Sequence, residues 1–322
     1  MAYYLGIDGG GSKTRCAVGD ESSLLATVTA GPSNITRVGE VRARESLHEA
    51  VRKACVAASI DPRQLRCACI GVAGAAREEI ASAVRKVVAE LIPGEIEVVG
   101  DMQIALEAAF GKGSGVIVIA GTGSIAYGRD ANGKTARAGG WGFAISDEGS
   151  AHWIGRAAVA SLLRAADQAA SDQTKSAHGR DARIEPEASP LFNQLKAAWN
   201  LDSLEQLART ANANPDFAAL FPAVLSAAGA GDDLAQHVLA QAGVELAQLA
   251  RIVVRRLFLE DNESLPVIPL AMAGGVFRYS PLVRDVFCDE VCKLDLRLEV
   301  NSQVVDPVAG ALQTARGCGR QS

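Results

Sequence analysis

Short apolar runs alternate with longer amphipathic stretches along the chain, which is the pattern of an α/β protein. Twice, an apolar run ends in a glycine-rich turn and is followed by two more strand-like segments separated by turns. The predicted strands cover residues 3–7, 14–18 and 24–29, and then 115–120, 125–128 and 135–138. Because the chain begins the same arrangement twice, we predict two related lobes with a cleft between them.

The segments after each set of strands complete the two lobes. Apolar periodicity predicts helices over 41–59, 80–91, 104–110, 234–258 and 281–291, and strands over 67–72, 96–99, 266–272 and 296–300. Between 151 and about 254 the chain is rich in Ala and Leu and mostly helical, with an exposed loop expected at 175–189. We therefore expect an N-terminal lobe at 1–114, a C-terminal lobe with a helical insertion at 115–304, and a C-terminal helix at 305–322 that packs back toward the N-terminal lobe.

Composition is compatible with two globular lobes. Of the 322 residues, 48% are hydrophobic and 21% charged, which leaves apolar material for a core in each lobe. The net charge of −5 does not favour a nucleic-acid partner, and no apolar run approaches the ~18 residues of a membrane span. The chain opens on a strand instead of a secretory signal, so we expect a cytoplasmic protein.

The seven cysteines form no disulfide framework, and we expect reduced thiols. Cys67-Ala68-Cys69 has the form of a metal-binding fragment. It lies inside an apolar run, however, and no matching pair of His or Cys residues accompanies it, so a structural role is favoured.

The first glycine-rich turn, Asp8-Gly9-Gly10-Gly11-Ser12-Lys13, has the chemistry of a phosphate site. Glycine lets backbone N–H groups approach phosphate oxygens closely, and the Ser12 hydroxyl and Lys13 ammonium add donors. Asp8, at the end of a strand, can hold Mg²⁺ directly or through water. The alternative is a hairpin turn that merely needs glycine. A Walker A loop is disfavoured, because Ser-Lys-Thr replaces Lys-Ser/Thr and a strand follows instead of a helix.

The second turn, Gly121-Thr122-Gly123-Ser124, can supply donors to the opposite side of the same phosphates. A hairpin is again the alternative for this turn taken alone. Two such turns, each opening a lobe, together favour a clamp on a nucleotide triphosphate.

Other segments carry candidate ligand groups. One aromatic among three glycines, in Gly139-Gly140-Trp141-Gly142, suits a loop that meets a ligand, although Trp141 could instead fill the core. In the run 146–150, Ser146 or Asp147 is expected to cap the helix that begins near Ala151. The four histidines form no triad or metal spacing and are interpreted as surface or packing residues.

Two further strand ends are candidate sites. Asp101 follows a predicted strand, at the edge where α/β proteins bind ligands, and its carboxylate can accept the proton of an attacking hydroxyl. Its alternative role is to cap the helix that follows. Ala273-Gly274-Gly275 can let a nucleobase lie against the backbone, or it can be a simple turn between a strand and a helix.

These motifs together resemble the N-acetylglucosamine kinases of the BadF/BadG/BcrA/BcrD ATPase family. The resemblance extends from Tyr4 to about Ala315 and is most specific between Gly139 and Trp153. It implies two actin-like (ribonuclease H-like) lobes, an ATP and Mg²⁺ requirement, an amino-sugar substrate and a homodimer.

The resemblance also implies roles for individual residues. Asp8 is expected near Mg²⁺, and Asp101 as catalytic base and sugar ligand. The remaining expected ligand residues are Gly10, Gly11, Ser12, Lys13, Gly121, Thr122 and Gly123 for phosphate, Ala273, Gly274 and Gly275 for adenosine, and Asn34, Gly140, Trp141, Gly142 and Asp147 for the sugar.

Two departures from the family pattern leave alternatives open. Ser12 replaces a common Thr but keeps the hydroxyl, and Met102-Gln103 replaces the small residues often found after the catalytic Asp, so the exact sugar is open. N-acetylglucosamine, converted to its 6-phosphate, is the first expectation, and glucosamine and N-acetylmuramic acid are alternatives. The third hypothesis is a non-kinase ATPase or sugar sensor that activates a partner protein. Activators in the family hold an iron–sulfur cluster between subunits through cysteines, and the helical spacing of Cys288 and Cys292 does not match that arrangement.

Overall fold

The N-terminal lobe is built on one five-stranded mixed sheet. The computed structural model describes residues 2–173, 188–213, 215–258, 267–294 and 297–318. The strand order is β3-β2-β1-β4-β5, in which β1 pairs antiparallel with β2 and parallel with β4. These strands are β1 (Tyr3–Gly9), β2 (Thr14–Gly19), β3 (Leu24–Ala30), β4 (Leu65–Val72) and β5 (Glu95–Gly100).

The second lobe repeats this sheet strand for strand. Its order is β10-β9-β6-β7-β8, and β6 pairs antiparallel with β7 and parallel with β9, as β1 does with β2 and β4. The strands are β6 (Gly115–Ala120), β7 (Ser124–Arg129), β8 (Thr135–Gly139), β9 (Ile268–Ala273) and β10 (Leu298–Val305). The predicted fold class, two related α/β lobes, is therefore confirmed.

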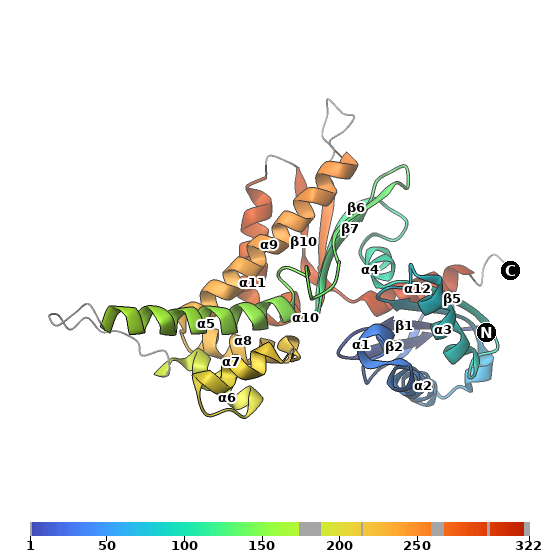
Figure 1. Ribbon diagram of the computed structural model, residues 1–322. Coiled ribbons are helices and arrows are strands. Elements are labelled where there is room, and N and C mark those ends of the chain that lie inside the picture. The colour runs from blue at the N-terminus through green and yellow to red at the C-terminus, as the bar shows by residue number, and fades with distance from the viewer. Residues whose placement is uncertain (1, 174–187, 214, 259–266, 295–296, 319–322) are drawn as a thin grey trace.

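Helices cover the sheets and differ between the lobes (Figure 1). The N-terminal lobe carries α1 (Ile35–Val38), α2 (Glu40–Ala57), η1 (Pro62–Gln64), α3 (Glu78–Ala89) and α4 (Asp101–Phe110). The second lobe carries α5 (Ala151–Gln173), α6 (Pro190–Trp199), α7 (Leu204–Asn212), η3 (Phe217–Leu220), α8 (Phe221–Gly229), α9 (Asp233–Phe258), α10 (Gly275–Tyr279) and α11 (Pro281–Cys292). Helices α5 to α8 form the insertion, and α5 extends from the junction of the lobes away from the N-terminal lobe in Figure 1.

The last helix, α12 (Pro307–Cys318), lies against the N-terminal sheet although it follows the last strand of the other lobe (Figure 1). Two glycines permit this close packing. A Cβ atom at Gly6 would be 2.3 Å from the backbone nitrogen of Leu312, and one at Gly310 would be 2.0 Å from the carbonyl oxygen of Ile104. Helix α12 also contacts α4 of the N-terminal lobe. Since β10 of the second lobe ends at Val305 and α12 begins at Pro307, the chain crosses between the lobes at Asp306.

The predicted strands and helices are confirmed within the described residues, and their ends agree to within two residues except in α4 and β10. Helix α4 begins at Asp101, three residues before its predicted start. Strand β10 runs to Val305, five residues beyond its predicted end. The prediction ended too early because the exposed polar residues 301–303 interrupt the apolar pattern, at a shift in register between Val300 and Val304. The predicted loop at 175–189 lies largely outside the described residues, as do the first residues of the strands predicted at 266 and 296.

In the part of the chain that the structure describes, no single helix has the length and apolar character to cross a membrane. One bent pair, Phe217–Gly229 with Asp233–Phe258, passes that test by length and composition together.

Candidate functional site at the junction of the lobes

The two glycine-rich turns meet where the lobes join. Ser12 Oγ lies 2.9 Å from Thr122 Oγ1, within hydrogen-bond distance. A Cβ atom at Gly11 would be 3.4 Å from the same Thr122 oxygen, so the two turns face each other directly. Both turns follow the first strand of their sheet, which explains why the repeated fold brings them to equivalent positions.

Backbone hydrogen bonds hold the first turn in shape. Gly10 donates to the Lys13 carbonyl at 3.0 Å, and the Gly10 carbonyl accepts from the N–H groups of Ser33 and Asn34. The Asn34 side-chain oxygen then caps α1, accepting from Thr36 N at 3.1 Å and Thr36 Oγ1 at 2.7 Å. Asn34 is thus next to the first glycine-rich turn, with its side-chain NH₂ group as the donor left for a ligand.

The second turn is joined to the start of α5. The carbonyls of Gly121 and Thr122 accept from the N–H groups of Ala151 and His152, at 2.9 and 3.3 Å. The prediction that Ser146 or Asp147 caps this helix was wrong. Ser150 Oγ accepts from Trp153 N at 3.2 Å, because Asp147 lies too far before the first turn of the helix and is used elsewhere.

Asp147 connects the second turn to the glycine-rich loop that follows β8. Its carboxylate accepts from the backbone N–H groups of Gly142 and Ser124, and a Cβ atom at Gly123 would be 2.7 Å from its Oδ2. Its backbone has φ of 65°, in the left-handed region that Asp tolerates better than most residues. Burial raises the pKa of Asp147 despite these two donors.

Asp8 lies at the end of β1 among like charges. Burial, followed by the carboxylates of Asp101 and Asp306, raises the pKa of Asp8 from 3.8 to about 7, against the opposing effect of Arg15. A carboxyl group in such surroundings binds either a proton or a cation. The candidate metal residue therefore stands where additional positive charge would be favourable.

Asp101 is the first residue of α4, at the end of β5. The alternative that it caps this helix is wrong, because Gly100 is the N-cap residue and Gln103 Oε1 accepts from Gly100 N at 2.8 Å. Asp101 Oδ1 accepts from Met102 N at 3.0 Å. Burial raises the pKa of Asp101, and its effects on Asp8 and Asp147 show that these three carboxylates share one region.

Sequence reasoning missed an ion pair at the crossing between the lobes. Arg15 Nη1 lies 3.0 Å from Asp306 Oδ2, and Arg15 is opposite Asp8 in the β1–β2 pairing. Two buried atoms of this pair, Arg15 Nε and Asp306 Oδ1, have no hydrogen-bond partner. The Asp306-Pro307 sequence gave a signal for the start of a helix, but none for proximity to Asp8.

Trp141 is placed differently from the other candidate sugar residues. Its side chain is 67% exposed, and the Arg137 guanidinium carbon lies 4.2 Å from the ring centroid. It lines a hollow of about 310 Å³ together with Ser146, Glu148 and residues of α9 such as Glu245. The alternative that Trp141 fills the core is therefore wrong, while Gly140 and Gly142 lie in the loop that Asp147 holds to the second turn.

The candidate adenosine motif adjoins the second turn through its backbone. A Cβ atom at Gly274 would be 2.2 Å from the carbonyl oxygen of Ala120, and φ at Gly274 is 100°. Only glycine satisfies both conditions. Ala273 is the last residue of β9, and Gly274 and Gly275 lead into α10 beside the end of β6 at Ala120. Tyr279, 58% exposed, has ring atoms 3.8–3.9 Å from the Cβ position of Gly275.

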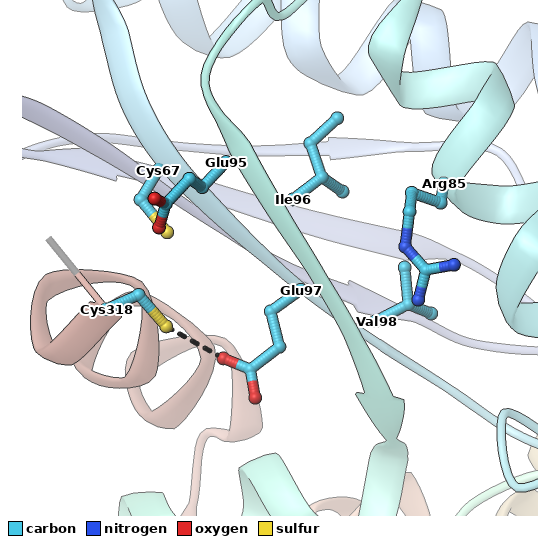
Figure 2. Close-up of a pocket in the computed structure, with 7 residues that line it drawn as sticks. All are labelled: Cys67, Arg85, Glu95, Ile96, Glu97, Val98 and Cys318. Atoms are coloured by element: carbon cyan, nitrogen blue, oxygen red, sulfur yellow. Dashed lines mark hydrogen bonds between the residues drawn. The ribbon is translucent and has the colours of Figure 1, made fainter. Parts of the chain in front are cut away.

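A second hollow, of about 300 Å³, lies between β5 and the end of α12 (Figure 2). Cys318 Sγ donates to Glu97 Oε2 at 2.9 Å, as the dashed line in Figure 2 shows. Burial, with further effects of Glu97 and Cys67, raises the pKa of Cys318 to about 12. This thiol is thus protonated at neutral pH, when a nucleophile or metal ligand requires the thiolate.

No disulfide and no cluster of metal-binding side chains occurs in the described ranges. All seven cysteines are free thiols. Within residues 2–173, 188–213, 215–258, 267–294 and 297–318, no three His, Cys, Asp or Glu side chains are grouped so that they could hold a metal ion.

Comparisons with known proteins agree over almost the full chain. An N-acetylmuramic acid/N-acetylglucosamine kinase of Clostridium acetobutylicum is 32% identical over 318 residues, covering 98% of this chain and 99% of that protein. An N-acetyl-D-glucosamine kinase of Dictyostelium discoideum is 29% identical, covering 96% of each chain.

Solved structures support the same fold. A Chromobacterium violaceum protein with a provisional N-acetylglucosamine kinase name has a TM-score of 0.72 and 26% identity, covering 97% of this chain and 98% of its own. A ROK family glucokinase of Streptomyces griseus, solved with glucose and AMPPNP, shares the fold with a TM-score of 0.60 and 16% identity, over 98% of this chain and all of its own. Residues 5–315 match one family in particular, and the chain belongs to the BadF/BadG/BcrA/BcrD ATPase family.

Proposed function

We propose that this protein is an ATP-dependent amino-sugar kinase that converts N-acetylglucosamine to N-acetylglucosamine 6-phosphate. The names of two relatives that match nearly its whole length support an amino-sugar acceptor. The observation that carries the proposal is the 2.9 Å approach of Ser12 Oγ to Thr122 Oγ1, because it makes two donor-rich turns available to one phosphate chain.

The two turns would bind the triphosphate from opposite sides. Gly10, Gly11, Ser12 and Lys13 act from the N-terminal lobe, and Gly121, Thr122 and Gly123 act from the second lobe. Backbone N–H and hydroxyl donors fixed in advance stabilise charge without reorganising during the reaction. Ala273, Gly274 and Gly275 would hold the adenosine, which is consistent with the close approach of Gly274 to Ala120 beside the second turn.

Asp101 would act as the base. As the sugar oxygen bonds to the γ-phosphorus, the bond between that phosphorus and the β–γ bridging oxygen breaks, ADP leaves with the electron pair, and Asp101 takes the hydroxyl proton. Burial raises the pKa of Asp101, which makes the carboxylate a better proton acceptor than an exposed Asp. Asn34, Gly140, Trp141, Gly142 and Asp147 would orient the sugar.

The cleft residues fit a hydrated Mg²⁺ ion. Asp8 experiences the like charges of Asp101 and Asp306, and Asp306 Oδ1 is a buried acceptor without a donor. Both observations indicate that positive charge and hydrogen-bond donors would be favourable there. Asp8 would hold the ion through water, and Mg²⁺ supplies charge neutralisation on the phosphate oxygens when it is bound.

A sugar panel tests the proposal. Release of ADP would be measured with N-acetylglucosamine, glucosamine, N-acetylmuramic acid, glucose or no sugar, at equal protein concentration. The proposal predicts the largest kcat/KM with N-acetylglucosamine and little turnover without sugar. A preference for one of the other amino sugars would change the substrate, and ATP turnover indifferent to every sugar would contradict the kinase assignment.

The predicted homodimer and cytoplasmic location belong to the same proposal; the homodimer rests on the family resemblance, and the location rests on the reduced thiols expected from the sequence. Light scattering coupled to gel filtration would check the first: a homodimer elutes at twice the mass of the 33.5 kDa chain.

A further inference from the structure

An arginine that sequence analysis did not single out connects the lobes beside the candidate site. Arg37, in α1, places Nη2 2.6 Å from Oδ1 of Asp216. Asp216 is the N-cap residue of η3 in the helical insertion, and its Oδ1 also accepts from Ala218 N at 3.1 Å. The pair therefore joins two segments 179 positions apart, with a carboxylate that its own helix holds in place.

The stem of Arg37 lies on the first glycine turn. From the Cβ position of Gly11, Arg37 Cδ is 3.2 Å away and Thr122 Oγ1 is 3.4 Å away. The end of the Arg37 stem therefore lies next to the point where the two turns meet, and the guanidinium beyond it reaches Asp216.

The far end of the pair adjoins the candidate sugar loop. Phe217, the residue after Asp216, packs edge-on against His152 with ring centroids 5.4 Å apart. The ring of Phe143, which lies in the loop after β8, is 4.9 Å from the same His152 ring. Burial, then Arg156 and Arg37, lower the pKa of His152, which agrees with a guanidinium close to that ring. Arg37 thus lies between the phosphate turns and the sugar loop.

We propose that Arg37 is a further catalytic residue, whose guanidinium binds the γ-phosphoryl group during transfer, and that Asp216 is a positioning residue that holds the guanidinium over the turns. This inference rests on the proposed kinase function. The transferred phosphoryl group carries negative charge on three equatorial oxygens, and a planar guanidinium can donate to two of them at once. The bonds that form and break are those given above, and Arg37 exchanges no proton.

A purely structural tie between the lobes predicts something different. The two side chains are 25% and 54% exposed, and exposed ion pairs contribute little to stability. Loss of such a tie would change the binding of ADP and of ATP by similar small factors. Loss of a contact with the γ-phosphoryl group would instead weaken the binding of ATP and leave the binding of ADP, which lacks that group, unchanged.

The test compares Arg37→Ala, Arg37→Lys and Asp216→Asn, with Arg156→Ala as matched control. Arg156 is an exposed arginine that also affects His152 but belongs to neither turn. Calorimetry would give the affinity of each variant for ADP and for a non-hydrolysable ATP analogue, and steady-state assays would give kcat and the two KM values. Melting temperatures would establish that every variant is folded.

Arg37→Ala is expected to weaken binding of the ATP analogue at least about tenfold more than binding of ADP, and to lower kcat by about 10²–10³-fold. Arg37→Lys should retain part of the affinity for the ATP analogue, because the positive charge is kept while the bidentate contact is lost. Asp216→Asn should lower kcat less than Arg37→Ala does. Arg156→Ala should change neither kcat nor the ratio of the affinities for ADP and the ATP analogue. Equal losses for ADP and the analogue, or a kcat within tenfold of the parent protein, would overturn the inference. If the parent protein binds nucleotide but shows no sugar-dependent turnover, the kinase proposal fails while the ratio of affinities still decides the role of Arg37.

Discussion

Ser12 and Thr122 are 110 positions apart and belong to different lobes, yet their hydroxyl oxygens lie 2.9 Å from each other. Each follows the first strand of a sheet with the same strand order, so the contact results from the duplicated architecture. A phosphate chain that enters between the turns replaces one neutral hydrogen bond by several bonds to charged oxygens. Hydrogen bonds to charged groups are roughly twice as strong, which favours the exchange.

Removal of either hydroxyl should therefore affect nucleotide binding more than folding. For Ser12→Ala and Thr122→Ala we expect ATP affinity to fall roughly 10-fold or more, while the free energy of unfolding without ligand changes by no more than about 1.5 kcal/mol. Calorimetry and chemical denaturation measure the two quantities. Ser22→Ala, in the turn at the other end of β2, is the control and should leave ATP affinity unchanged. Parent-like ATP affinity in both test variants would contradict the phosphate clamp.

The two glycines of the second turn should respond differently to an added methyl group. A Cβ atom at Gly123 would be 2.7 Å from Asp147 Oδ2, whereas one at Gly121 meets nothing within 4 Å. Gly123→Ala should displace Asp147 and raise the KM for the sugar by about tenfold or more, because a small misplacement of orienting groups is costly. Gly121→Ala is the matched control for sugar binding. Equal sugar KM values in the two variants would show that Asp147 does not influence the sugar site.

The pKa of Asp8 predicts a pH-dependent cost to folding. This pKa is about 7 in the folded chain and near 3.8 when Asp8 is exposed. Between these values the folded state binds a proton that the unfolded state has lost, so stability from this group falls as pH rises from about 4 to 7. The full cost applies above pH 7, and it disappears below pH 4.

Without nucleotide or Mg²⁺, Asp8→Asn should thus raise the melting temperature at pH 8 by at least about 2 °C, and the gain should shrink toward pH 4. Asp20→Asn is an informative control, because hydrogen bonds from Ser22 and Ser23 lower the pKa of this exposed carboxylate, so its removal should have the opposite sign at pH 8. A melting-temperature gain for Asp8→Asn that is equal at pH 4 and pH 8 would show that burial and the neighbouring carboxylates do not raise the pKa of Asp8.

The architecture and the meeting of the two turns could be predicted from local patterns. The apolar runs that end at Asp8 and Gly121 are buried central strands, and strand patterning together with the glycine turns identified them. The cap of α5 could not be assigned in the same way, since Ser146, Asp147 and Ser150 all suit an N-cap. Ser150 takes that role because tertiary contacts with Ser124 and Gly142 occupy Asp147.

Contacts between distant segments had no local signal. Arg37 pairs with Asp216 and Arg15 with Asp306, and in each pair the partners come from different lobes or from the crossing between them. Nothing in the sequence near either of these partly buried arginines identifies a partner so far along the chain. The end of β10 was missed for another reason, because its polar residues 301–303 interrupt the apolar pattern at a shift in register.

The most direct test of the account is the rate of sugar-dependent ADP release by the parent protein and by Asp101→Asn, at saturating ATP and N-acetylglucosamine. The substitution keeps the shape of the side chain but removes the proton acceptor. We predict a fall in kcat of about 10²–10⁴-fold, with both substrates still bound and the melting temperature retained. In the parent protein, kcat should also decrease at acidic pH, below a pKa that burial holds above the usual value for Asp. A folded Asp101→Asn protein that keeps more than about a tenth of the parent kcat would contradict the assignment of Asp101 as the base.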